Sequence, residues 1–228
     1  ETEGAEVAED DDGSYSVTLA DVSNNGRQTR AATTYTVVSA GDADILYPDF
    51  SLGSNFNAAT RPRYLKFNGD NTAPDGTEKL ACYCMDSIKG DPAGDIGLAD
   101  LDSAKGQLAY VLGNGLRAYG GTMWNTDFQY TGEYTGAGKT WKQWEKDYFV
   151  TAITVHLICL RNGIENHGIS ADDVLANMKS KGSVFYNKVK KFYDAAVADD
   201  GNYVAGGNFR ATNFLVDGAT SKDLDIRK

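Results

Sequence analysis

Alternating polar and apolar residues dominate the first third of the chain. Residues 14–19 alternate, Asn24-Asn25-Gly26 follows as a turn, and residues 29–40 are rich in Thr, Val and Tyr. Alternation puts apolar side chains on one face of a strand, and Asn-Gly is a frequent hairpin turn. The pattern therefore predicts a hairpin. Residues 64–67 and the segment that ends at Cys84 predict two further strands, so we expect antiparallel β structure.

The periodicity becomes helical after residue 97. Leucines and a valine at helical spacing predict a helix over residues 100–112, ended by Gly113 and Gly115. A Gly/Tyr/Thr-rich connection follows, residues 114–140. Connections of this length are uncommon unless they are functional or mobile, so we expect a flap over a site.

A second helix is predicted over residues 141–160, which contain neither Gly nor Pro. Thr140 is a candidate N-cap, and Asn162-Gly163 marks the end. From residue 149 the segment is apolar nearly all round, which is typical of a helix inside a core. Amphipathic helices are predicted over residues 170–180, with Ser170 as N-cap, and over residues 183–198.

Strand patterns return near the end of the chain. Residues 203–204 and 209–216 alternate, and residues 224–228 resemble the start of a strand or a linker. Strands, then helices, then strands predict an α+β fold with an antiparallel β-sandwich or barrel body and a helical insertion. The predicted organisation is an acidic, disordered tail (1–12) and one domain (13–228), whose β body (13–86 and 203–228) encloses a helical subdomain (87–202).

Charge and cysteine content narrow the classes of protein. Seven of the negative charges behind the net −10 lie within residues 1–12, which leaves −3 for the rest of the chain. A nearly neutral body without a basic stripe argues against nucleic-acid binding. No apolar run is long enough to span a bilayer, and the start lacks a signal peptide, so we expect a mature or excised fragment. Three cysteines leave at least one thiol free.

The main candidate for chemistry is Cys84, within Leu-Ala-Cys-Tyr-Cys-Met-Asp at residues 80–86. Cys82 and Cys84 would share one face of a strand, where a disulfide between them would be strained. Cys84 lies where the strand gives way to a Gly/Pro/Asp loop, which would leave its sulfur approachable. The alternative is a cysteine that packs as a small hydrophobic residue.

Two motifs together resemble the thioester domain of Gram-positive surface adhesins. Tyr83-Cys84-Met85-Asp86 ends a strand, and Tyr-Phe-Val-Thr-Ala-Ile-Thr-Val-His follows at residues 148–156 on a buried helix. In that family an aromatic-Cys-apolar motif supplies the sulfur, and a Thr-Gln-x-apolar-apolar-aromatic motif supplies the carbonyl of an internal Cys–Gln thioester. The order of elements agrees over residues 13–228.

The chain departs from the family at the acyl position. Ala152 follows Thr151 where the family has glutamine, and none of the four glutamines of the chain follows that threonine. The rest of the helix motif is kept, apart from His156 in place of an aromatic residue. A deliberate Gln→Ala replacement fits this pattern better than natural decay.

The resemblance implies a secreted, cell-wall-anchored adhesion protein rather than an enzyme. A lysine amine of a host surface or matrix protein would attack the thioester and form an isopeptide link, in one turnover and without a cofactor. Small amines could also enter. With Ala152 in place, the domain would be inactive. We expect a monomer with no nucleic-acid or membrane partner.

The roles of the other candidate residues stay open. His156 lies one helical turn from Ala152 and could relay a proton, although a lone histidine on an apolar helix is more often a satisfied core residue. Asp86 could hydrogen-bond near the leaving sulfur or be solvated. Tyr83 could contact a partner. The tyrosines of the connection could contact a partner or face inward as a lid; these are Tyr119, Tyr130 and Tyr134. His167 has no evident partner, and the Cys/His spacing does not suit zinc.

Two other classes of function compete with the thioester interpretation. One is a cysteine-dependent acyl-transfer enzyme with Cys84 as nucleophile and His156 as base, for which no third orienting group is evident. The other is a β-rich adhesin module that binds without a covalent bond. Ala152→Gln discriminates among them, because only a thioester protein would then lose ammonia spontaneously.

Overall fold

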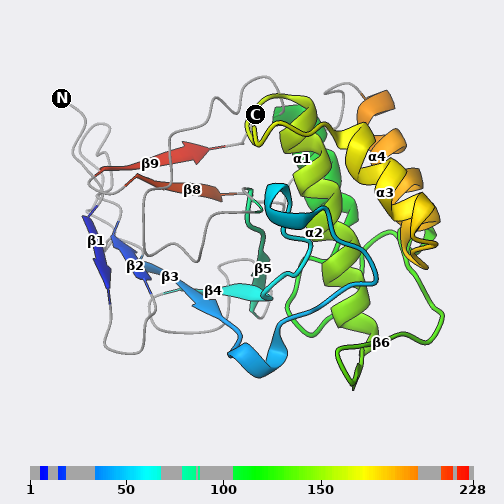
Figure 1. Ribbon diagram of the computed structural model, residues 1–228. Helices are drawn as coiled ribbons and strands as arrows, with labels where there is room; N and C mark the ends of the chain where they lie inside the picture. The colour runs from blue at the N-terminus through cyan, green and yellow to red at the C-terminus, as the bar shows by residue number, and fades with distance from the viewer. Residues whose placement is uncertain are drawn as a thin grey trace.

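The computed structural model describes residues 6–9, 15–18, 34–67, 79–85, 87, 105–199, 212–217 and 220–225 (Figure 1). The helices are α1 (Lys105–Asn114), α2 (Gln143–Arg161), α3 (Ala171–Ser180) and α4 (Tyr186–Asp199), with short 3-10 turns η1 (Asp42–Asp44), η2 (Gly53–Asn55) and η3 (Thr126–Phe128). The strands are β1 (Glu6–Glu9), β2 (Tyr15–Thr18), β3 (Thr34–Ser39), β4 (Arg63–Phe67), β5 (Leu80–Cys82), β6 (Thr135–Gly136), β7 (Lys139–Thr140), β8 (Thr212–Asp217) and β9 (Thr220–Asp225).

Five strands form one antiparallel sheet in the order β1-β2-β3-β4-β5. The predicted hairpin is confirmed, because β2 pairs with β3 in the register Tyr15↔Val37. The predicted strand at residues 64–67 is β4, and β5 pairs with it through Arg63↔Cys82. Residues 6–9, within the segment predicted as an acidic tail, form β1, which pairs with β2.

The predicted β-sandwich or barrel body is wrong. Among the described residues, the strands form this one sheet and two separate hairpins, and they close no barrel. The C-terminal segment was predicted to share one β body with residues 13–86. Strand β8 pairs with its sequence neighbour β9 in a separate hairpin, and β9 lies in contact with β1. Figure 1 shows the four helices gathered on one side of the molecule and the sheet on the other. The predicted domain boundaries stay a prediction.

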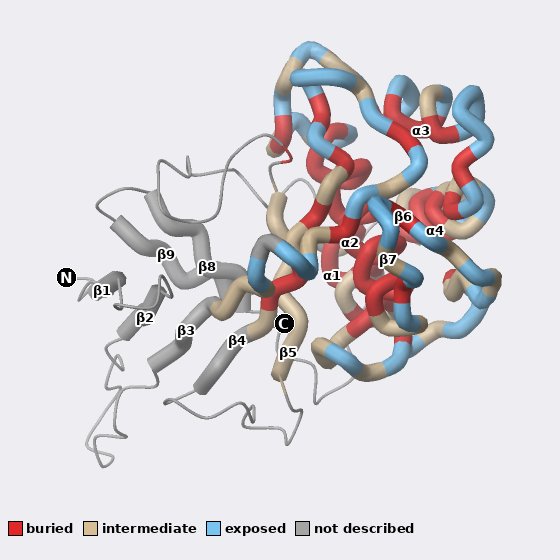
Figure 2. The backbone as a smooth tube through the Cα atoms, turned by 60° about the horizontal axis from the view of Figure 1, so that its bottom comes forward, coloured by how far each residue is buried: buried red, intermediate tan, exposed pale blue. Residues whose placement is uncertain are grey.

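Helix α2 is the centre of the hydrophobic core, as its composition predicted. Every residue from 145 to 160 is buried. In Figure 2, buried residues line α1, α2 and α4. Phe50 and Phe56, from the irregular segment before β4, cover α2 through edge contacts with Phe149 and His156. The large apolar side chains of the described core therefore surround a helix rather than fill the space between two sheets.

The helix ends follow the capping signals in part. Ser170 caps α3 as predicted, since its hydroxyl accepts a hydrogen bond from the Asp173 amide at 3.2 Å. The predicted N-cap Thr140 is wrong, because Thr140 lies in β7 and the chain enters α2 at Lys142, whose amide donates to Glu145 at 2.6 Å. Helix α1 continues past Gly113 to Asn114, two residues beyond its predicted end.

The predicted flap is a packed part of the helical half. Both oxygens of the buried Asp147 accept hydrogen bonds, Oδ2 from the Met123 amide at 3.2 Å and from Gln129 Nε2 at 2.8 Å, and Oδ1 from Gln143 Nε2 at 2.8 Å. Phe128 is buried and stacks on Phe192 of α4. A segment fixed in this way by a buried carboxylate is held in place rather than free to swing.

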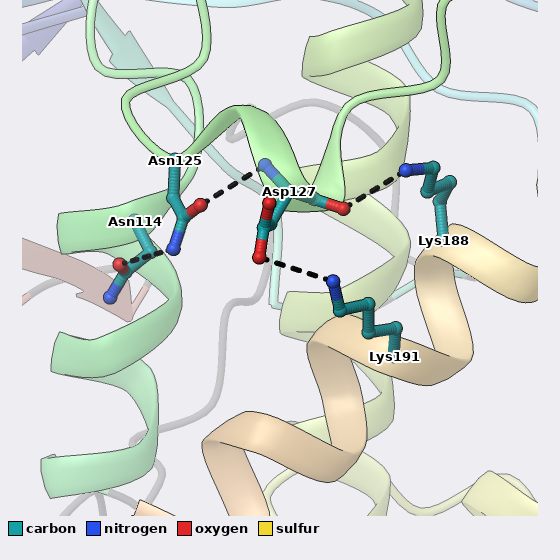
Figure 3. Close-up of polar contacts among 5 residues, drawn as sticks. All are labelled: Asn114, Asn125, Asp127, Lys188 and Lys191. Atoms are coloured by element: carbon teal, nitrogen blue, oxygen red, sulfur yellow. Dashed lines mark hydrogen bonds and ion pairs between the residues drawn. The ribbon is translucent and has the colours of Figure 1, made fainter.

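A second set of polar contacts ties η3 to the helices on either side (Figure 3). The Asn125 side chain accepts a hydrogen bond from the Asp127 amide at 3.1 Å and donates to Asn114, the last residue of α1, at 3.3 Å. From α4, Lys188 donates to the Asp127 carbonyl at 3.0 Å and Lys191 to its carboxylate at 3.2 Å. These contacts, exposed except for the part-buried one between Asn125 and Asn114, join α1, η3 and α4.

Candidate functional site

The cysteine motif lies at the boundary between the sheet and α2. Strand β5 ends at Cys82, so Tyr83 and Cys84 lie just beyond it. The Tyr83 ring stacks on Tyr148 of α2, with ring centroids 4.9 Å apart. The Tyr148 hydroxyl donates a hydrogen bond to the Cys82 carbonyl and accepts one from the Arg63 amide. The segment that carries Cys84 is therefore fixed against the first half of α2.

Thr151, the residue before the acyl position, takes part in the same contacts. Its hydroxyl donates to the Asp147 carbonyl at 2.8 Å and accepts from the Leu116 amide at 3.1 Å. The carbonyl of Leu116 in turn accepts a hydrogen bond from the Tyr83 hydroxyl. The backbone amide and carbonyl of Leu116, just after α1, thus link Tyr83 of the first motif to Thr151 of the second. The next residue, Ala152, is buried.

Burial keeps both phenols of this contact neutral. It raises the pKa of Tyr83 well above its usual range, and the neighbouring Tyr148 adds to this effect while a hydrogen bond with Thr151 opposes it. Burial likewise raises the pKa of Tyr148, against the opposing effect of Arg63. Neutral phenols remain hydrogen-bond donors, as the contacts to the carbonyls of Cys82 and Leu116 require.

None of the three cysteines takes part in a disulfide. Burial raises the pKa of the Cys82 thiol to about 12, with Arg63 opposing the shift, so this thiol stays protonated at neutral pH. Cys159 is buried within α2, whereas Cys82 and Cys84 are both half-buried. The choice of Cys84 as the reactive thiol rests on its motif and stays a prediction. That Cys84 rather than another cysteine faces Ala152 stays a prediction.

His156 has a buried acidic partner that sequence reasoning missed. Its Nδ1 lies 2.9 Å from Oε2 of Glu165, whose side chain is fully buried. Oε1 of the same carboxylate accepts the Ser87 amide at 2.7 Å and lies 3.5 Å from His167 Nε2. His167, expected to have no partner, therefore lies beside this carboxylate. The sequence signal was weak, because Glu165 lies in the turn after α2 and belongs to no motif.

The cluster around Glu165 favours an ionised carboxylate. Burial alone would raise the pKa of Glu165, but His156 and the hydrogen bonds from Ser87 outweigh it, and the pKa is lowered. The contact satisfies His156 within the core, and it also supplies the orienting group that the enzyme alternative lacked. Among the described residues, no group of three or more His, Cys, Asp or Glu side chains is placed to hold a metal ion.

The tyrosines predicted to contact a partner are partly buried and pack inward. Tyr119 lies against Trp144, with ring centroids 4.6 Å apart. Tyr130 and Tyr134 both pack against Phe185, with ring centroids 5.0 and 4.8 Å from that of Phe185. These contacts favour the inward-facing alternative, and a role in partner binding stays a prediction. Asp86 lies outside the described residues.

The comparisons with known proteins add no family assignment. No family model, curated protein or solved structure matches the chain. Within the described helices, no stretch combines the length and apolar character needed to cross a membrane.

Proposed function

We propose that this chain is a covalent adhesion domain of the thioester type, inactive here because Ala152 occupies the position of the acyl glutamine. With glutamine at residue 152, Cys84 would form an internal thioester. A lysine amine of a host surface or matrix protein would then open it, and small amines would do the same. The protein would act once per molecule, as a monomer on the cell wall of a Gram-positive bacterium, with no cofactor and with no nucleic-acid or membrane partner.

The observation that carries this proposal is the contact between the two motifs. Tyr83, next to Cys84, stacks on Tyr148, and the peptide of Leu116 connects its hydroxyl to Thr151, next to residue 152. A thioester requires the sulfur and the acyl carbon to be held together in one orientation, and rigid neighbours on both sides supply that constraint. The contact lies in the buried part of α2, residues 145–160, where water has little access to an activated acyl group.

The chemistry that this arrangement supports has two steps. In the first, the sulfur of Cys84 attacks the side-chain carbonyl carbon of a glutamine at residue 152, a carbon–sulfur bond forms, and the amide nitrogen leaves as ammonia. In the second, an amine nitrogen attacks the same carbon, the carbon–sulfur bond breaks, and Cys84 leaves as a thiolate that takes up a proton. The product is an amide between residue 152 and the partner.

Intact mass spectrometry of Ala152→Gln tests the proposal. The folded variant is expected to be lighter than its sequence mass by one ammonia, and methylamine should add covalently at residue 152. Adding Cys84→Ser should abolish both effects, whereas the matched control Cys82→Ser should keep them, because Cys82 lies within β5, before the motif that supplies the sulfur. A folded Ala152→Gln protein with its full sequence mass and no amine adduct would refute the proposal.

One observation favours a second candidate function, a cysteine-dependent acyl-transfer enzyme. Glu165 orients His156 as the acidic member of a nucleophile–base–acid set would. An enzyme of this kind needs no glutamine at residue 152, so the chain with Ala152 should be acylated at Cys84 by an activated ester and should release the acyl group repeatedly. The thioester proposal predicts no turnover with that substrate.

A further inference from the structure

Glu165 is a single buried carboxylate that contacts both sides of the proposed site. Oε1 accepts the amide of Ser87, three residues after Cys84, at 2.7 Å. Oε2 lies 2.9 Å from Nδ1 of His156, one helical turn beyond residue 152. The carboxylate therefore joins the segment that supplies the sulfur to the helix that supplies the acyl position.

The ionisation of Glu165 decides which nitrogen of His156 carries the proton. The pKa of this buried carboxyl is lowered by His156 and Ser87 despite its burial, so the group is ionised at neutral pH. An ionised carboxylate only accepts hydrogen bonds. Nδ1 of His156 must then donate, and in the neutral ring Nε2 is the nitrogen that can take up a proton.

We propose that Glu165 is a positioning residue of the thioester site, which holds the segment after Cys84 through the Ser87 amide and fixes His156 as the Nδ1–H tautomer. This inference rests on the proposed function and deepens it. In the aminolysis step, Nε2 of His156 would take the proton that the attacking amine loses and deliver it to the sulfur of Cys84 as the carbon–sulfur bond breaks. His167 also faces this carboxylate, with its Nε2 at 3.5 Å from Oε1.

Variants in the Ala152→Gln background separate this role from packing. Glu165→Gln keeps an oxygen for the Ser87 amide, but its NH2 group would donate to Nδ1 of His156 and force the wrong tautomer. His156→Asn keeps a donor toward Glu165 but removes the ring nitrogen that takes up a proton. His167→Asn is the matched control, because it changes a neighbour of the same carboxylate without touching His156.

The measurements are the fraction of protein that has lost ammonia and the rate of addition of hydroxylamine as a function of pH. Hydroxylamine suits the pH profile because it stays largely unprotonated near neutral pH. We expect Glu165→Gln and His156→Asn each to slow addition by about tenfold to a hundredfold, with a flattened pH profile. The double variant should be no slower than either single one, since both remove the same function. His167→Asn should behave as its parent.

The outcomes separate a failure of the proposed function from a failure of the role proposed for Glu165. If Ala152→Gln alone keeps its full mass, the proposed function fails and this inference with it. If Ala152→Gln forms the thioester but Glu165→Gln reacts at the parent rate with the parent pH profile, the inference is overturned and the proposed function stands. If Glu165→Gln does not fold, His156→Asn decides, because a parental rate and profile for that variant would equally overturn the proton-transfer role.

Discussion

Gly115→Ala should destabilise the protein through a collision at the proposed site. A methyl group at this position would meet Cγ2 of Thr151 at 2.4 Å, Oγ1 of Thr151 at 2.7 Å and the carbonyl oxygen of Val111 at 2.8 Å. All three distances are shorter than real contacts of a Cβ atom. The threonine cannot turn away without cost, because its hydroxyl is engaged with Asp147 and Leu116.

The magnitude follows from three effects. Forcing a methyl group into a packed core costs about 1–3 kcal/mol. Displacing Thr151 weakens two hydrogen bonds, each worth about 0.5–1.5 kcal/mol. Replacing glycine also restricts the unfolded chain, which offsets the loss by about 0.4–1 kcal/mol. We therefore expect Gly115→Ala to lower the free energy of unfolding by about 1–5 kcal/mol.

Urea unfolding measures this loss, and a double-mutant cycle assigns its cause. Gly41→Ala is the control, since nothing lies within 4 Å of a methyl group there, and it should leave the free energy of unfolding nearly unchanged. In a Thr151→Ala background, Gly115→Ala should cost less, because two of its three close contacts are gone. If Gly115→Ala is as stable as Gly41→Ala, or costs the same with and without Thr151, the collision is not the cause.

Two further predictions concern buried carboxylates. Asp147→Asn should lower the free energy of unfolding in urea by about 1–3 kcal/mol, because the single oxygen of an amide cannot accept from the donors on both sides of the carboxylate. The control Asp127→Asn removes a charge from an exposed ion pair and should cost less than about 1 kcal/mol. Equal losses for the two variants would contradict this prediction. The lowered pKa of Glu165 means that its ionised form stabilises the folded state. The stability difference between the parent and Glu165→Gln should therefore be fully present above about pH 4.3 and shrink as pH falls through the folded-state pKa, and a difference that grows on acidification would argue against an ionised Glu165.

Local patterns predicted the elements well where one interaction decides the outcome. Ser170 caps α3 through Asp173, as the residue types indicated, and Gly163 ends α2 with a positive φ of 70°. The burial of α2 on all sides followed from its apolar composition. These features depend on residues within one or two turns of each other, so the sequence alone contains the information.

Long-range pairing could not be predicted in the same way. The alternation of residues 209–216 indicated a strand but not its neighbour, and the strand pairs with β9 instead of completing a sandwich. The length of the connection after α1 indicated a flap, but Asp147 receives two of its hydrogen bonds from that connection. Cys84, Ala152 and His156 were proposed from motifs, whereas Glu165 was missed because its role depends only on what the fold places around it.

The contacts also explain why alanine at residue 152 is compatible with this fold. Tyr148 and Thr151, rather than residue 152, carry the contacts of α2 to the cysteine segment and to Leu116. A glutamine at the buried position of Ala152 would bring an amide into the core, and an amide without hydrogen-bond partners costs about 1–3 kcal/mol there. On the proposed function, thioester formation would remove the amide nitrogen as ammonia and leave a less polar group in its place. The burial that makes alanine harmless would thus also favour the thioester over the free glutamine, once Cys84 is held within reach.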